Sequence, residues 1–369
     1  MRRSVRSSRA VWFRGIALAV VLPLALVVVA TRLGLPSRAD APAAAATAGC
    51  GNAGLPTLGG LFGQAVAANQ RGIAVGTATD AAGASHAVIW RSGRVSQLVT
   101  GTTDAVATGV NVRGDVIGTG QVGAAAVGWV WSRGAATRLR SDPDERAVPA
   151  AIDDRGLVVG ALTENEGSEG EMPGANENEQ AAFWQSASAS PTVLRPLTGD
   201  QGGNALAVDN RGRIGGVSAG AGFRPVIWDA GRTPHALAGL GGGYGAVRAL
   251  ADSGLAAGDA VSADGVDHPV TWDASGRITQ LDLPPGARSG QALAILPGGT
   301  VLGVADVPLP GGGVQKQAVR WKASSAALLS APQRQSSSAP GGATDATSYV
   351  GYRTDAVGGR HPVLWHCGR

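Results

Sequence analysis

Six glutamates crowd one short segment of the chain, and these residues are the strongest candidates for chemistry. The segment spans residues 163–180 and reads TENEGSEGEMPGANENEQ. Clustered carboxylates could bind Ca²⁺, which prefers oxygen ligands, although the ordered D-x-D-x-D-G spacing of a calcium loop is missing. A solvated insertion is the alternative. The candidate binding residues are Glu164, Glu166, Glu169, Glu171, Glu177 and Glu179.

Other patterns that could do chemistry lack the elements needed to position them. Gly118–Gly123 matches a dinucleotide fingerprint and Gly216–Gly220 matches a nucleophile elbow. Both motifs need a strand before them and a helix after them, and an apolar strand follows instead. No Cys/His spacing suits a metal. We therefore predict no catalytic, cofactor-binding or metal-binding residue. Three of the five histidines recur four residues before a tryptophan: His86, His268 and His361.

A repeated phrase supplies the elements. Seven tryptophans each close a short apolar run such as HAVIW or RPVIW, at intervals of 41 to 53 residues, and a glycine ends an earlier segment of every copy. We number these repeats one to seven by their tryptophans. They are Trp90, Trp131, Trp184, Trp228, Trp272, Trp321 and Trp365, and the glycines are Gly76, Gly118, Gly160, Gly216, Gly258, Gly303 and Gly351.

Each repeat divides into four strand-length segments bounded by turn residues. Turns such as Asn111–Gly114 and Asp209–Gly212 suit a hairpin with a glycine bulge. Four strands in a unit of 40 to 50 residues predict a β-propeller. We expect an all-β, seven-bladed propeller of four-stranded antiparallel blades, with the tryptophans as apolar wedges between blades.

The seventh repeat ends soon after Trp365 and lacks its fourth strand. A spare strand, Leu55–Leu58, precedes repeat one, so we expect the N-terminal strand to pair into the last blade and close the ring. That pairing would bring Cys50 near Cys367, and we predict a disulfide between them. Two unrelated thiols are the alternative.

An export segment precedes this domain. Five arginines in residues 1–14 are followed by an apolar stretch, which indicates a signal peptide or an N-terminal anchor in residues 1–30. We favour a cleaved signal. Residues 31–52 read as an Ala/Pro-rich linker, and the propeller spans 53–369. The formal charge of +4 belongs mainly to the leader, so a nucleic-acid partner is not expected.

The phrase resembles the HAF repeat of predicted extracellular bacterial proteins. Ala65–Trp90 is the best match, with His86 and Ala87 in the name-giving positions, and the resemblance covers nearly all of 55–369. Later copies depart from it, with Pro225, Pro269 and Pro362 in place of the alanine. The family implies an exported repeat protein of propeller type and no established activity.

These observations favour an exported, non-enzymatic binding or structural module at the cell surface or in the envelope. Its expected partner is a cell-wall glycan or a surface protein, its membrane contact is limited to the N-terminal segment, and its expected state is a monomer. An extracellular glycosidase or lyase is the alternative, because propellers also host enzymes. We expect any ligand on the face that carries the acidic loop, together with the loops at Val304–Gln317 and Tyr352–Gly359.

Overall fold

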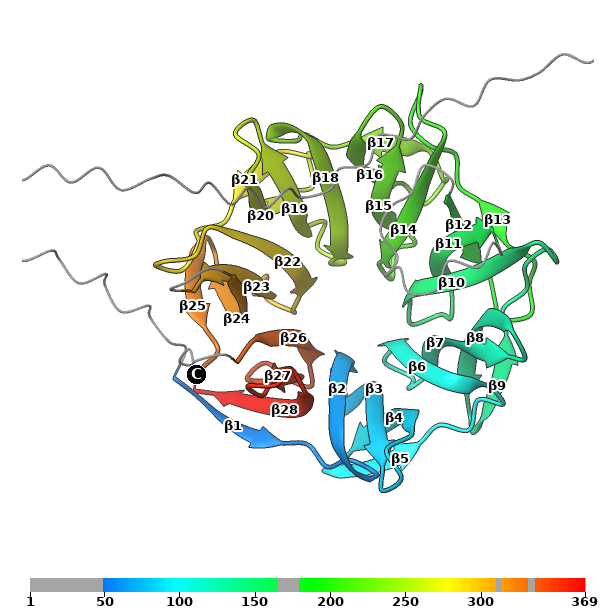
Figure 1. Ribbon diagram of the computed structural model, residues 1–369. Helices are drawn as coiled ribbons and strands as arrows, with labels where there is room; N and C mark the ends of the chain where they lie inside the picture. Colours follow the sequence, from blue (N-terminus) through cyan, green and yellow to red (C-terminus); the bar gives the residue numbers. More distant parts are fainter. Residues whose placement is uncertain (1–48, 165–178, 310–312, 331–335, 369) are drawn as a thin grey trace, which may run out of the picture. The chain divides into compact units, whose positions relative to one another are not determined.

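Strands are the regular secondary structure of the described residues. The computed structural model describes residues 49–164, 179–309, 313–330 and 336–368. The predicted export segment 1–30 and the four glutamates between 165 and 178 lie outside these residues. Successive antiparallel sheets surround a hub, with the first strand of each sheet innermost (Figure 1). The all-β propeller prediction is therefore confirmed.

Five sheets are separate four-stranded blades. They consist of β2 (Gly59–Asn69), β3 (Ile73–Asp80), β4 (Ser85–Arg91) and β5 (Arg94–Gln97); β6 (Thr103–Val110), β7 (Val116–Val122), β8 (Ala125–Ser132) and β9 (Ala135–Arg138); β10 (Glu145–Ile152), β11 (Val158–Glu164), β12 (Gln180–Trp184) and β13 (Thr192–Val193); β22 (Ser289–Ile295), β23 (Val301–Pro308), β24 (Val314–Lys322) and β25 (Ser325–Leu328); and β26 (Ser338–Ala343), β27 (Ser348–Thr354), β28 (Arg360–Cys367) and β1 (Cys50–Gly54).

The remaining eight strands form one continuous sheet, so the prediction of seven separate four-stranded blades is wrong. A parallel residue pair between Phe223 and Tyr244 joins its two antiparallel sets. The glycines at 241–243 lengthen the inner strand and carry Tyr244 beside Phe223, with ring centroids 6.0 Å apart. The strands are β14 (Gly202–Val208), β15 (Ile214–Ala219), β16 (Phe223–Trp228), β17 (Pro234–Ala236), β18 (Gly241–Leu250), β19 (Ala256–Ser262), β20 (Asp267–Trp272) and β21 (Ile278–Gln280).

The N-terminal strand closes the ring, as expected, but different residues form it. β1 pairs antiparallel with β28, in the register that sets Cys50 opposite Cys367. The predicted Cys50–Cys367 disulfide is confirmed. The predicted strand Leu55–Leu58 is wrong. These residues follow β1, and Leu55 and Leu58 pack against the core cluster that contains Trp90. The Pro56 carbonyl accepts a hydrogen bond from the Trp90 indole N–H at 2.7 Å.

The repeat tryptophans act as wedges between neighbouring sheets. Trp228, for example, packs against Leu157 and Val159 of the preceding sheet. Burial of such rings is a main source of apolar stabilisation. Five of the indole N–H groups also donate to a carbonyl in the segment that links the two sheets. These bonds join Trp90 to Pro56, Trp184 to Arg140, Trp228 to Arg195, Trp272 to Ala238 and Trp321 to Asp282.

Repeat two departs from this rule. Its buried wedge is Trp129, which is 1% exposed and packs against the preceding sheet, whereas Trp131 is only partly buried. Both lie on one face of β8 because side chains two residues apart on a strand share a face. The expectation that Trp131 is the wedge is therefore wrong, and repeat two is distorted at its third strand.

The repeated glycines are required by close packing against the inner strand. Each faces a β-bulge in the inner strand, and a Cβ atom there would lie about 2 Å from a backbone carbonyl oxygen of that strand, as Gly160 illustrates with Val148 at 2.0 Å. Only glycine permits this approach. The extra residue of each bulge is half-buried on the inner strand. These residues are Val66, Thr108, Ala150, Leu206, Arg248, Leu293 and Gly341.

Candidate functional site

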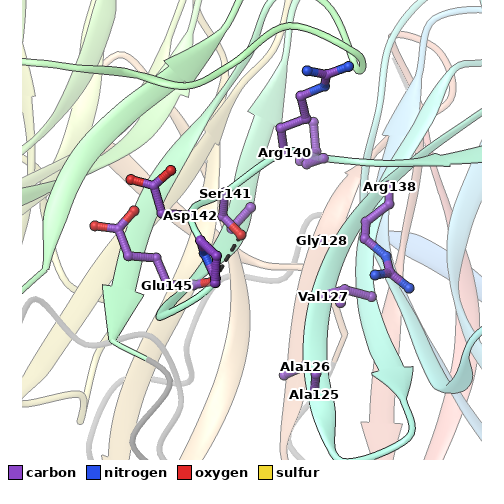
Figure 2. Close-up of a pocket in the computed structure, with 12 residues that line it drawn as sticks. Ala125, Ala126, Val127, Gly128, Arg138, Arg140, Ser141, Asp142 and Glu145 are labelled. Carbon is purple, nitrogen blue, oxygen red and sulfur yellow. Dashed lines mark hydrogen bonds between the residues drawn. The ribbon is translucent and has the colours of Figure 1, made fainter.

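A pocket lies between the sheet of repeat two and the inner strand β10 of the next sheet. Its volume is about 420 Å³. One wall is the beginning of β8, Ala125–Gly128, with Arg138 of the adjoining β9 beside it, and the opposite wall is the linking segment that carries Asp142 and Glu145 (Figure 2). Figure 2 shows the Asp142 and Glu145 carboxylates together on one flank and the Arg138 side chain on the other.

A second pocket of about 350 Å³ continues the first one. Both are lined by Ala126, Val127 and Ala147, and the second extends to Thr108 and Arg146 on the inner strands. We call the two pockets together the β8 groove. Each is within the range of about 300–1,000 Å³ that is usual for ligand sites.

Repeat two lacks the polar side chain that other repeats carry at the start of their third strand. The position four residues before the repeat tryptophan is Val127 here. In repeat one it is His86, which bonds the Asp80 carboxylate at 2.8 Å. In repeat four it is Arg224, which pairs with Asp200 at 2.9 Å. Valine cannot make such a bond.

Val127 lies on the face of β8 that Trp129 and Trp131 share. Toward the next sheet the beginning of β8 therefore presents only Ala126 and Gly128, and this lack of long side chains leaves the groove open.

Charges of both signs border the groove. Arg138 and Arg140 are exposed, and so is Asp142, whereas Glu145 is half-buried. Burial raises the pKa of Glu145, and the neighbouring charges of Asp142 and Glu164 raise it further. Guanidinium groups recognise carboxylates in a bidentate manner. The groove can thus accept an acidic group at one flank and a basic group at the other.

The structure places two of the six candidate glutamates. Glu164 lies directly opposite Glu145 in the β10–β11 pairing, so this end of the acidic segment borders the β8 groove. Glu179 is buried elsewhere and accepts a hydrogen bond from Asn204 at 3.1 Å. The described residues contain no group of three or more His, Cys, Asp or Glu side chains suited to a metal.

The remaining predicted positions lie inside regular hairpins. Gly118–Gly123 covers most of β7 and its turn, and Gly216–Gly220 runs along β15, with no helix after either motif in the described residues. His361 bonds Asp355 within its own hairpin at 3.0 Å. The expected loop at Val304–Gln317 is largely made of the lengthened strands of the β23–β24 hairpin, whereas most of Tyr352–Gly359 is the turn between β27 and β28.

Side chains from the inner-strand turns line a cavity of about 230 Å³ at the hub. Asn210 donates from its amide nitrogen to Asp154 at 2.8 Å and to Asp252 at 3.2 Å. These bonds run from one sheet to the next. The cluster therefore ties neighbouring sheets together, and its polar groups bond one another.

A buried ionic cluster in repeat five was not anticipated. Asp259 is fully buried and forms an ion pair with Arg248, which also donates to the Tyr244 hydroxyl at 3.1 Å. Burial raises the pKa of Tyr244 to about 12. A signal was present in the sequence. Arg248 is the one charged residue at the bulge position of the seven repeats, and Asp259 is the one charged residue directly after the repeat glycine.

Asp267 beside this cluster should make stability depend on pH. Burial, with a contribution from Asp259, raises its pKa to about 6, above the ordinary 3.8. The folded state therefore binds this proton more tightly than the unfolded chain does. Through this group the free energy of unfolding should fall by about 1–2 kcal/mol as pH rises from about 4 to 6, allowing for solvent screening.

The variant Asp267→Asn tests this expectation. The asparagine does not titrate, so the variant should gain stability relative to the parent between pH 4 and pH 7. Urea unfolding at both pH values measures the difference. A difference between variant and parent that is the same at pH 4 and pH 7 would show that Asp267 does not titrate in this range.

Comparison with known proteins bears on the fold. No family model matches the chain, and no curated protein matches it by sequence. The acylaminoacyl peptidase of Pyrococcus horikoshii is similar in structure, with a TM-score of 0.54 and 11% identity over 84% of this chain and 52% of that chain. The β-propeller domain of the trilobed protease from Pyrococcus furiosus has a TM-score of 0.53 and 8% identity, over 82% of this chain and 93% of that chain. The structure of YCF48 bound to D1 peptide has a TM-score of 0.51 and 13% identity, over 89% of this chain and 100% of that chain.

At these identities the likeness shows a β-propeller and nothing finer. The solved structures with this fold include both enzymes and a peptide-bound protein, so the fold itself leaves the function open. In the described ranges, no helix is long and apolar enough to span a bilayer. The β8 groove must carry any functional conclusion.

Proposed function

We propose that this chain is an exported, non-enzymatic binding module of the HAF-repeat type that holds an extended segment of another surface protein in the β8 groove. The observation that carries the proposal is the groove itself, an open space between two sheets with the Arg138 guanidinium on one flank and the Asp142 and Glu145 carboxylates on the other (Figure 2). A polypeptide segment offers both charges on one chain, with small apolar side chains between them.

The wall of the groove supports a peptide over other ligands. On the groove side the beginning of β8 presents Ala126 and Gly128, which have little or no side chain and leave room for the stem of an extended peptide. No aromatic ring lines the first pocket, although stacking on rings is a common way to bind sugars. Export, which the leader predicts, agrees with a disulfide in the domain.

An extracellular glycosidase or lyase has one observation in its favour. Glu145 has a raised pKa and lies near Asp142, as in a pair of catalytic carboxylates. Glycoside hydrolysis, however, uses two carboxyl groups that flank the scissile bond from opposite sides. Figure 2 places both carboxylates on the same flank of the pocket, which favours binding over hydrolysis.

Parallel arrays test the proposal. The purified full chain is applied to one array of random twelve-residue peptides and to one of cell-wall glycans. We expect retention on a subset of peptides that carry both acidic and basic residues, and loss of at least tenfold in affinity for the double variant R138A/R140A. The variant R94A/R277A, with exposed arginines on other sheets, is the control. Retention on glycans alone would overturn the proposal.

A further inference from the structure

The edge of β8 that faces the groove is unoccupied where β9 has ended. β9 pairs with β8 from Trp129 to Ser132, and the Leu139 N–H then donates to the Gly128 carbonyl at 2.9 Å. Ala125–Val127 pair only with β7, on the other edge, among the described residues. Backbone groups in a strand alternate between its two edges. Since Gly128 faces the groove, Ala126 also directs its N–H and C=O there.

The same position is tied to the next sheet in other repeats. It lies five residues before the repeat tryptophan, and backbone groups of the next inner strand occupy it in two repeats. The Glu179 carbonyl accepts from Gly203 N–H at 2.8 Å, and Phe223 pairs in parallel with Tyr244. Side chains bridge it in three more: Lys316 N–H donates to the Ser337 hydroxyl at 3.2 Å, Gln291 donates to Asp267 at 3.0 Å, and Arg360 donates to Gln64 at 2.7 Å.

In several repeats the next outward-facing residue of the strand has no backbone N–H. The position three residues before the tryptophan also faces outward, and it is proline in repeats four, five and seven: Pro225, Pro269 and Pro362. Proline has no N–H and blocks pairing at an exposed edge. In repeat two the residue is Gly128. Repeat two thus keeps its outward donors, and the following inner strand does not cover Ala126.

The reason lies in the start of β10. The inner strands that reach the edge, β14 and β18, begin with the glycines at 202–203 and 241–243. β10 begins instead with Glu145 and Arg146, whose side chains border the groove. Without glycine the backbone cannot approach β8 as closely. The space between β8 and β10 stays open as the β8 groove.

From these observations we infer that the β8 edge at Ala126 is a strand-addition slot. An extended peptide enters the groove, and its backbone bonds the N–H and C=O of Ala126, as Tyr244 of the chain's own β18 does at Phe223. Alternate side chains of the peptide then meet Arg138 on one flank and Asp142 and Glu145 on the other, with Arg140 at the rim (Figure 2). Peptides commonly bind to exposed sheet edges in this way. The inference rests on the proposed function and names its mechanism.

The test uses the tightest-binding peptide from the random array. Single N-methyl groups are placed at each backbone nitrogen in turn, which removes one donor and leaves the side chains intact. We expect the loss of affinity to alternate along the peptide, at least tenfold at every second position of the central segment, because only alternate residues face one edge.

A protein variant gives the complementary result. Ala126→Pro removes the N–H that faces the groove and leaves the bonds to β7, so affinity should fall at least tenfold. Ser85→Pro, at the equivalent position of repeat one, is the matched control and should bind as the parent does. Circular dichroism and tryptophan emission verify that both variants fold, and the N-methyl series stands independently of them.

The outcomes separate the two proposals. If the peptide binds, and R138A/R140A weakens it, but N-methylation and Ala126→Pro have no effect, strand addition is overturned and groove binding stands. If Ser85→Pro weakens binding as much as Ala126→Pro, the Ala126 slot is also overturned. If no peptide in the array binds the chain, both proposals fall.

Discussion

Replacing both cysteines by serine should lower the free energy of unfolding by about 2–5 kcal/mol, the largest effect we expect from any change at the ring closure. The Cys50–Cys367 disulfide joins residues separated by 317 positions in the sequence. In loop-closure models a cross-link over so long a loop removes much of the entropy of the unfolded chain.

The location of the bond adds a local consequence. β1 is five residues long, is mostly exposed, and pairs with β28 alone. A short terminal strand of this kind frays when nothing else holds it. Once β1 leaves, the edge of β28 is open, and the following segment with Pro56 loses its anchor. Limited proteolysis should then cut near residues 50–58 before it cuts elsewhere.

Denaturant unfolding of the parent and of C50S/C367S, each with and without reductant, measures the effect. Reductant should bring the parent to the stability of the variant and should leave the variant unchanged. A reduced parent that unfolds at the same denaturant concentration as the oxidised one would show that noncovalent contacts alone hold the closure.

Much of this fold could be read from repetition. The tryptophans and glycines recur because every sheet meets its neighbours in the same way, and each glycine passes a carbonyl of a bulged inner strand. Local patterns therefore predicted four-stranded antiparallel units, the closing strand and the disulfide. The exact residues of the closing strand were missed because Leu55–Leu58 is as apolar as a strand and serves as core packing instead.

The features that could not be predicted from the sequence are departures from the repeat. The join of two units through Phe223 and Tyr244 depends on how far an inner strand reaches, which periodicity does not measure. The β8 groove arises from the small residues Ala126 and Gly128 and from an uncovered backbone edge, so it is a space left between elements. Such a space has no motif in the sequence.

Replacing Arg248 by methionine is expected to lower the free energy of unfolding by about 3–5 kcal/mol. Its partner Asp259 has no exposed surface, and the side chain of Arg248 is 26% exposed. Removal of one member of a buried pair leaves the other charge without compensation, and the cost is of this order. The Tyr244 hydroxyl loses a donor at the same time.

The double variant R248M/D259L separates the cost of an isolated charge from the cost of altered packing. Apolar replacement of a whole buried ion pair is often neutral or stabilising, so the second change should recover most of the lost stability. Leu293→Met, at the equivalent bulge position of repeat six, exchanges similar volumes and should cost less than about 1.5 kcal/mol.

The pH dependence of the same variants provides a second readout. Arg248 lowers the pKa of Asp267, against the burial and the Asp259 charge that raise it. Without the guanidinium, the pKa of Asp267 should rise further in R248M, and the stability lost through this group should extend to higher pH. An R248M variant as stable as the parent, with an unchanged pH profile, would show that Asp259 is compensated by groups other than Arg248.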